Sequence, residues 1–69
     1  MAIDNDLMDT IEAAQYIHVH VRTLEGWRFR GTGPRFLRFS NRVVRYRKAD
    51  LDVFLERATV EPRTAQEGY

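Results

Sequence analysis

The sequence predicts a small, mainly helical domain with one β-hairpin, in the order helix, turn, helix, hairpin, helix. Two observations support this fold class. Apolar residues recur at helical spacing in three segments, 10–17, 21–30 and 48–58. Between the last two segments, short runs rich in aromatic and β-branched residues flank a polar turn. A chain of 69 residues has room for one domain.

The first helix is expected over residues 10–17. Thr10 is a suitable N-cap, and Glu12 in the first turn suits the positive end of the helix dipole. The apolar stripe of this helix consists of Ile11, Ala14 and Ile17, with Ala13 beside them. The paired alanines allow another helix to approach closely. The preceding pair Leu7-Met8 is either a short strand or the lead-in to the helix.

The second helix is expected over residues 21–30, after a three-residue turn, His18-Val19-His20. Leu24 and Trp27 share its buried face, so Trp27 is predicted to fix this helix to the core. Gly26 costs about 1 kcal/mol relative to alanine inside a helix, which predicts that another backbone comes close there. Two short helices joined by such a turn form the skeleton of a helix-turn-helix.

The hairpin is expected to follow at once, because Gly31 fits the end of a helix and Pro34 prevents its continuation. Its strands are predicted at residues 35–39 and 43–47, with Arg42 near the tip. The third helix is predicted at residues 48–58. The expected core is completed by Phe36, Leu37, Phe39, Val44, Tyr46, Leu51, Phe54 and Leu55. Residues 7–58 thus form the domain, between a disordered N-terminus, 1–6, and a flexible tail, 59–69.

Charge is distributed unevenly along the chain, although the net charge is only +1. Residues 22–48 hold nine basic side chains and one acid, whereas residues 1–21 and 49–69 carry net charges of −4 and −3. Ten of the eleven basic residues are arginine, and a GC-rich genome would also explain that preference. It does not explain the clustering, which predicts a polyanionic partner, namely double-stranded DNA.

Other function classes find little support in the sequence. The chain has no cysteine, and His18 and His20 are two residues apart rather than three or four, so no metal site is expected. Gly31-x-Gly33 precedes a hairpin rather than a helix, so it is not a phosphate-binding loop. We expect no catalytic residues and no cofactor. The acidic start is unlike a signal peptide, and no apolar run is long enough to span a bilayer, so a cytoplasmic protein is expected.

Four motifs in this order resemble a known family. They are Thr10-x-x-Ala13-Ala14-x-x-Ile17, Thr23-x-x-x-Trp27, Gly31-x-Gly33-Pro34 and Arg42-x-x-Arg45-Tyr46-Arg47-x-x-Asp50-Leu51-x-x-Phe54-Leu55. Together they resemble the MerR-like winged helix-turn-helix domain of phage and mobile-element excisionases, or recombination directionality factors, and of AlpA-type regulators. The resemblance implies that the second helix enters the major groove and that the hairpin, the wing, reaches a minor groove. His18 and His20 stand where the family usually has Gly and Ser, and Gly26 where it often has a large polar residue.

The predicted DNA contacts fall into two groups. On the recognition helix they are His20, Arg22, Thr23, Glu25, Gly26, Arg28 and Arg30. On the wing they are Arg35, Arg38, Asn41, Arg42 and Arg45. Arg22 at the helix start is expected to read base edges, and Arg28 and Arg30 to bind phosphate. Arg42 is expected in a minor groove.

Alternatives remain for several of these residues. For Arg22 and for Arg42 the alternative is a side chain that lies in solvent and makes no contact with DNA. Thr23 either bonds a phosphate or packs near the turn. Glu25 either accepts from a cytosine or pairs with Arg22 or Arg28. At least one of Arg35, Arg38 and Arg45 is alternatively expected to pair with Asp50 or Asp52.

The resemblance implies a non-enzymatic excisionase in a bacterial host, which binds several adjacent sites, bends attachment-site DNA and biases a phage integrase toward excision. Cooperative self-association on DNA would accompany this role. A small phage transcription regulator of the same fold is the first alternative, and a protein–protein adaptor module is the second. The tail ending in Gly68-Tyr69 is a possible contact for the integrase or a neighbouring copy.

Overall fold

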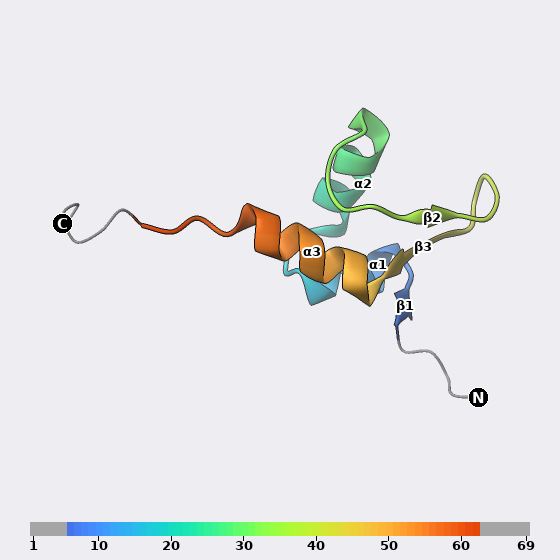
Figure 1. Ribbon diagram of the computed structural model, residues 1–69. Coiled ribbons are helices and arrows are strands. Elements are labelled where there is room, and N and C mark those ends of the chain that lie inside the picture. Colours follow the sequence, from blue (N-terminus) through green and yellow to red (C-terminus); the bar gives the residue numbers. More distant parts are fainter. Residues whose placement is uncertain (1–5, 63–69) are drawn as a thin grey trace.

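The computed structural model describes residues 6–62, and its elements follow the predicted order. The helices are α1 (Thr10–Tyr16), α2 (Val21–Arg30) and α3 (Lys48–Ala58), and the strands are β1 (Leu7–Met8), β2 (Leu37–Arg38) and β3 (Val44–Arg47). Figure 1 shows α2 standing away from α3 and the β2–β3 hairpin projecting beyond both. This is a winged helix-turn-helix architecture. Most of the two terminal segments expected to be flexible, residues 1–5 and 63–69, lie outside the described residues.

The sheet has three antiparallel strands in the order β1-β3-β2, one more than the predicted hairpin. Leu7–Met8 is therefore a strand, and Met8 pairs with Tyr46. On the other side of β3, Arg38 pairs with Val44. Both hairpin strands are shorter than the apolar runs predicted, because the ladder between them pairs only Leu37 with Arg45 and Arg38 with Val44. We call residues 37–47 the wing.

The start of α1 differs from the prediction. Asp9, not Thr10, is the N-cap: its Oδ1 accepts from the Glu12 backbone N–H at 2.8 Å, and its own N–H donates to Glu12 Oε1 at 2.9 Å. This reciprocal capping box satisfies two backbone donors that the first turn would otherwise leave unpaired. Thr10 is consequently the first helical residue, and the helix ends at Tyr16, one residue before the predicted end.

The two histidines of the turn shape its backbone. His18 has a φ of 62°, the left-handed conformation for which glycine is better suited. His20 is the N-cap of α2, and its Nδ1 accepts from the Arg22 backbone N–H at 3.0 Å. A ring nitrogen therefore replaces the hydroxyl that usually caps a helix here.

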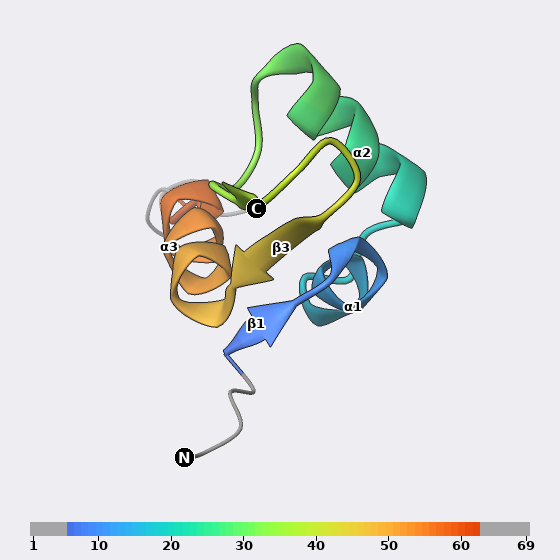
Figure 2. The ribbon, with the colours of Figure 1, turned by 90° about the vertical axis from the view of Figure 1, so that its right-hand side faces the viewer.

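The core lies where α1, α2, β3 and α3 meet. Its buried side chains are Ala13, Ala14, Ile17, Leu24, Val44, Tyr46 and Leu51. Figure 2 shows β3 between α1 and α3, with α2 at the top of the view. The small side chains of Ala13 and Ala14 are 0% and 2% exposed, which leaves room for neighbouring elements to pack closely on α1.

Three residues predicted on apolar faces are exposed instead. Phe39 is 62% exposed because it follows the end of β2, where the wing leaves the helices. Ile11 is 59% and Leu55 39% exposed, since only one side of α1 and of α3 meets the core. A domain of this size has too little interior for all its apolar residues.

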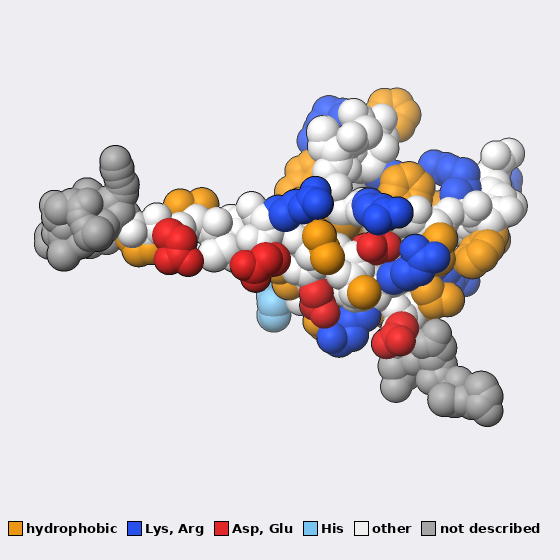
Figure 3. All heavy atoms as spheres, viewed as in Figure 1, with side chains coloured by type: hydrophobic (Ala, Val, Ile, Leu, Met, Phe, Trp, Pro, Cys, Tyr) orange, Lys and Arg blue, Asp and Glu red, His pale blue; other side chains and the backbone are white. Residues whose placement is uncertain are grey.

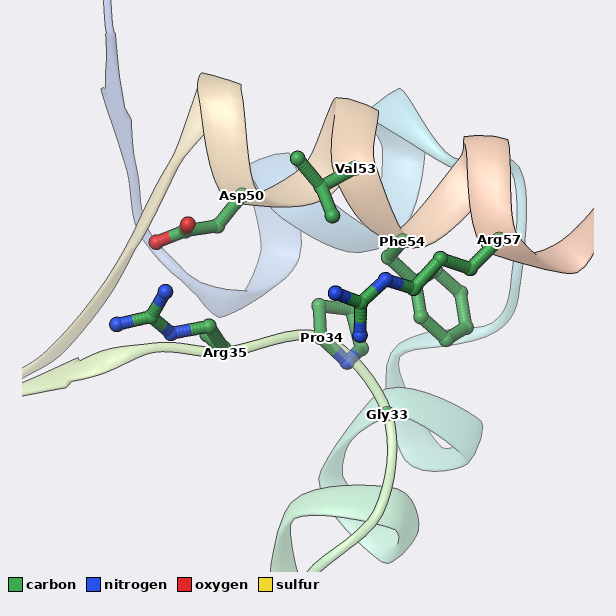
Figure 4. Close-up of a pocket in the computed structure, with 7 residues that line it drawn as sticks. All are labelled: Gly33, Pro34, Arg35, Asp50, Val53, Phe54 and Arg57. Atoms are coloured by element: carbon green, nitrogen blue, oxygen red, sulfur yellow. The ribbon is translucent and has the colours of Figure 1, made fainter.

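Trp27 packs half-buried at the edge of the core, as predicted, with its ring 5.4 Å from that of Phe54 on α3. Gly33 has a φ of 86°, and a Cβ there would lie 2.8 Å from the Trp27 Cβ. Only glycine fits that position without displacing the tryptophan. Figure 4 shows Gly33 and Pro34 passing under α3 beside Phe54. The loop after α2 therefore locks α2 to α3.

Candidate nucleic-acid interface

The solvent-facing side of α2 carries four of the seven DNA contacts predicted on the recognition helix. Arg22, Thr23, Glu25 and Arg30 are exposed, whereas Leu24 on the opposite side is fully buried. The helix therefore presents a polar face away from the core. His20, just before it, is exposed as well, although its ring is held by the capping hydrogen bond.

A hollow joins α2, the start of α1 and the wing. We call it the arginine hollow, because four of its lining side chains are Arg28, Arg38, Arg42 and Arg45. The remaining lining residues are Asp9, Thr10, Ile11, Glu25, Asn41 and Val44. Two residues predicted on the helix thus meet four predicted on the wing. Four guanidinium groups outnumber two carboxylates there, which makes the hollow attractive to phosphate.

Arg28 is tied into the fold. Its Nη1 donates to Thr10 Oγ1 and to Tyr46 Oη, each at 3.1 Å. Its guanidinium also lies 5.8 Å from the centre of the Phe36 ring. The side chain therefore links α2 to α1 and β3. Nε and Nη2 remain as donors that a phosphate can use.

The tip of the wing is closed by short-range hydrogen bonds. The Phe39 N–H donates to the Val43 carbonyl at 2.8 Å, and the Arg42 N–H donates to Ser40 Oγ at 3.3 Å. Within residues 6–62 the Arg42 guanidinium has no partner, so it is available to a ligand. Arg45 Nη1 donates to the Val44 carbonyl at 2.8 Å.

Not every predicted contact faces the hollow. Arg38 does line it, and its guanidinium lies 5.5 Å from the centre of the Phe36 ring. Arg35 lines a separate pocket under α3, where it turns toward Asp50 while Arg57 extends across Pro34 (Figure 4). Arg35 is therefore the predicted wing residue that the structure separates from the others.

The prediction that another backbone of the chain lies close to Gly26 is wrong. The three atoms nearest to the place of a Cβ all belong to the guanidinium of Arg30, the closest at 3.3 Å. No other element within residues 6–62 comes close there. Arg30 instead folds back along its own helix, over the glycine.

The expected ion pairs are also wrong for the described residues. The pairs formed within 6–62 are Arg47–Asp50 at 3.4 Å and Lys48–Asp52 at 3.0 Å. Spacings of three and four residues at the start of α3 bring these partners together, ahead of any wing arginine. Glu25 pairs with neither Arg22 nor Arg28. Asp50 and Asp52 of α3 therefore do not neutralise the arginines that line the hollow.

A small polar cluster connects α1 to α3. Tyr16 Oη donates to Asp52 Oδ1 at 2.5 Å, and Lys48 Nζ donates to Asp52 Oδ2 at 3.0 Å. The hydrogen bond from Tyr16, followed by that from Lys48, lowers the pKa of Asp52 below its ordinary value. The hydrogen bond with Asp52 raises the pKa of Lys48 in turn.

Acidic side chains gather along α3 and the segment after it, on the face shown in Figure 3. The cluster of Asp52 and the ion pair of Asp50 belong to this side. The arginine hollow, in contrast, lies between α2 and the wing. Lys and Arg side chains lie among these acids on the same face, whereas four arginines face two carboxylates in the hollow, which is the side that favours a polyanion.

Comparisons with known proteins agree with this geometry. A family model described as a helix-turn-helix domain matches residues 7–59. A comparison with curated proteins gave no match. Within residues 6–62 no group of acidic or histidine side chains is arranged to hold a metal ion, and no helix is long and apolar enough to cross a membrane. Since the match covers well over half of the chain, the protein belongs to the helix-turn-helix family of DNA-binding domains.

Proposed function

We propose that this protein is an excisionase, a non-enzymatic factor that binds and bends attachment-site DNA so that an integrase carries out excision. The observation that supports the proposal is the arginine hollow, in which the recognition helix and the wing present cations to one ligand. The four motifs that resemble excisionases lie within the residues that match the family model. The action would take place in the cytoplasm of a bacterial host.

The docking mode follows from the two surfaces. The polar face of α2 enters the major groove, where Arg22 and Glu25 reach base edges while Thr23 and Arg30 bind the flanking phosphates. The wing then lies across the backbone, with Arg42 and Asn41 at its tip reaching the minor groove. The spare donors of Arg28, together with Arg38 and Arg45, hold the phosphates between the two grooves.

Bending is the expected consequence of contact on both grooves. Cations gathered on one side of a duplex neutralise the phosphates there, and the duplex then bends at a modest cost of a few kcal/mol. A single copy of so small a domain reads few base pairs. Several copies on adjacent sites, assembling cooperatively, would supply the missing specificity.

A recombination assay tests the proposal. A plasmid that carries the two hybrid attachment sites is incubated with the integrase of the same mobile element, with and without the protein. We expect the protein to stimulate excision and Arg42→Ala to reduce the stimulation. Arg57→Ala, in the pocket under α3, is the matched control and should act like the unaltered protein.

The DNA complex itself is measured by gel shift on the same attachment-site duplex at several salt concentrations. Stepped complexes are expected, and six phosphate contacts predict a log–log salt slope of about −5. Absence of any complex at low salt would refute DNA binding and favour the adaptor module. A complex without any effect on excision, together with repression of a nearby promoter, would identify a transcription regulator instead.

A further inference from the structure

Phe29 is the most exposed of the large hydrophobic residues that the structure describes. Its side chain is 91% exposed, at the end of the recognition helix and next to Arg30. Packing against the core does not explain a phenylalanine there. We propose that Phe29 is a specificity-determining residue that contacts the 5-methyl group of a thymine in the major groove. This inference depends on the docking of α2 proposed above.

The position of Phe29 on α2 supports a DNA contact. At about 100° per residue, Arg22, Gly26 and Phe29 fall within an arc of about 60°. That arc is centred opposite Leu24, which is fully buried. Phe29 therefore belongs to the same outward stripe as Arg22, the residue expected to read bases.

The length of the stripe matches the spacing of base pairs. Phe29 follows Arg22 by seven positions in the helix, which is about 10 Å along the axis. The rise of B-DNA is about 3.4 Å per base pair. When α2 lies along the groove, Phe29 thus faces a base pair about three steps from the one that Arg22 contacts.

Gly26 lies between these two residues on the outward stripe and, as a glycine, adds no side chain to the helix surface there. The fold does not require a glycine at this position, because the nearest atoms to a Cβ would be the mobile end of Arg30. A glycine inside a helix nevertheless costs about 1 kcal/mol relative to alanine. Its benefit is that base edges can approach the backbone of α2 closely between Arg22 and Phe29.

The surrounding charges favour DNA over a second copy as the occupant. Arg22 and Arg30 lie on the same exposed side of α2, and the arginine hollow is adjacent. Another copy docked through this face would bring like charges together, whereas a duplex brings phosphates. The thymine methyl is the main apolar group that a major groove offers to such a ring.

The test uses the full chain and a duplex selected by it from a random-sequence pool. Each thymine is then replaced in turn by deoxyuridine, which removes only the methyl group and keeps the base pair. At one position we expect the unaltered protein to bind about fourfold more weakly, as for one buried methyl group of about 0.8 kcal/mol. We expect Phe29→Ala to bind the thymine duplex about tenfold more weakly and to lose the discrimination against deoxyuridine.

Val60→Ala is the matched control, since Val60 is 84% exposed and lies beyond α3. It should bind like the unaltered protein and keep the discrimination. Melting temperatures of both variants should be unchanged, because neither side chain is buried. Selection of a bound duplex without any sensitivity to deoxyuridine would overturn the inference while leaving DNA binding intact.

Equal discrimination by Phe29→Ala and the unaltered protein would also overturn it. Loss of stepped complexes by Phe29→Ala, with single-site binding unaltered, would assign Phe29 to contact between copies instead. Failure to select any duplex would refute the proposed function rather than this contact alone.

Discussion

Replacement of Arg28 by alanine should weaken the fold. The guanidinium donates to Thr10 and to Tyr46, and the side chain of Tyr46 is fully buried. Removal of the donor leaves a buried hydroxyl unpaired, which costs about 1–3 kcal/mol. The loss of contact with the Phe36 ring adds a few tenths to about 1 kcal/mol. We therefore expect a total loss of about 2–3 kcal/mol.

Thermal unfolding, followed by circular dichroism, measures this effect. For a domain of this length each kcal/mol corresponds to about 4–8 °C, so the melting temperature should fall by at least about 8 °C. Arg30→Ala is the matched control, because this arginine lies two residues further along α2 and is exposed on the polar face. It should change the stability by no more than about 0.5 kcal/mol.

A double-mutant cycle separates the hydrogen bond from the rest of the loss. In a Tyr46→Phe background the buried hydroxyl is absent, so Arg28→Ala should cost about 1 kcal/mol less than in the unaltered protein. Equal costs in both backgrounds, or equal melting temperatures for Arg28→Ala and Arg30→Ala, would show that Arg28 does not hold the fold together.

Three further changes have distinct outcomes. Gly33→Ala should lower the melting temperature by at least about 10 °C, because its Cβ would overlap the side chain of Trp27. Gly31→Ala is the control: it has open space around it and should cost only about 1 kcal/mol of backbone strain. Equal shifts in melting temperature for the two variants would contradict the overlap. Arg42→Ala should weaken binding to all duplexes and reduce the salt slope by about 0.9, while Arg57→Ala leaves both unaltered in the same gel-shift titrations. The pKa of Asp52 is lowered from 3.8 in the folded protein, so its stabilising contribution is present above that pH and is lost as the pH falls through the folded pKa. Asp52→Asn should therefore make the melting temperature depend less on pH below about 4. If the melting temperature of the variant falls with acid as steeply as that of the unaltered protein, Asp52 does not cause that fall.

Local signals were sufficient to predict much of the fold. The bounds of α2 and α3 agree with the predicted segments, because Gly31 and Pro34 end the first and apolar periodicity defines the second. The length of a strand depends instead on its partner. β1 pairs with a strand almost forty residues later, and a pattern of two apolar residues cannot indicate such a pairing.

The candidate site was predictable by residue type but not by position. The charge pattern placed the interface within residues 22–48, and the arginine hollow lies there apart from its α1 residues. The separation of Arg35 from the other wing arginines depends on the path of the chain after Pro34, which sequence spacing does not show. Phe29 is absent from both the predicted core and the predicted contacts, although its place opposite Leu24 on a helical wheel already indicates that it is exposed.

The arginines of this chain divide into structural and available groups, and this division determines how the protein should respond to salt. Arg28 is hydrogen-bonded within the core region, and Arg47 is paired with Asp50 at the start of α3. Asp50 and Asp52 of α3 are thereby paired with neighbours in sequence, while Arg42 keeps its guanidinium free within the described part of the chain. Salt dependence reflects the phosphates actually neutralised, so the net charge of +1 does not limit it. A steep salt slope from a nearly neutral protein is the result that this arrangement requires.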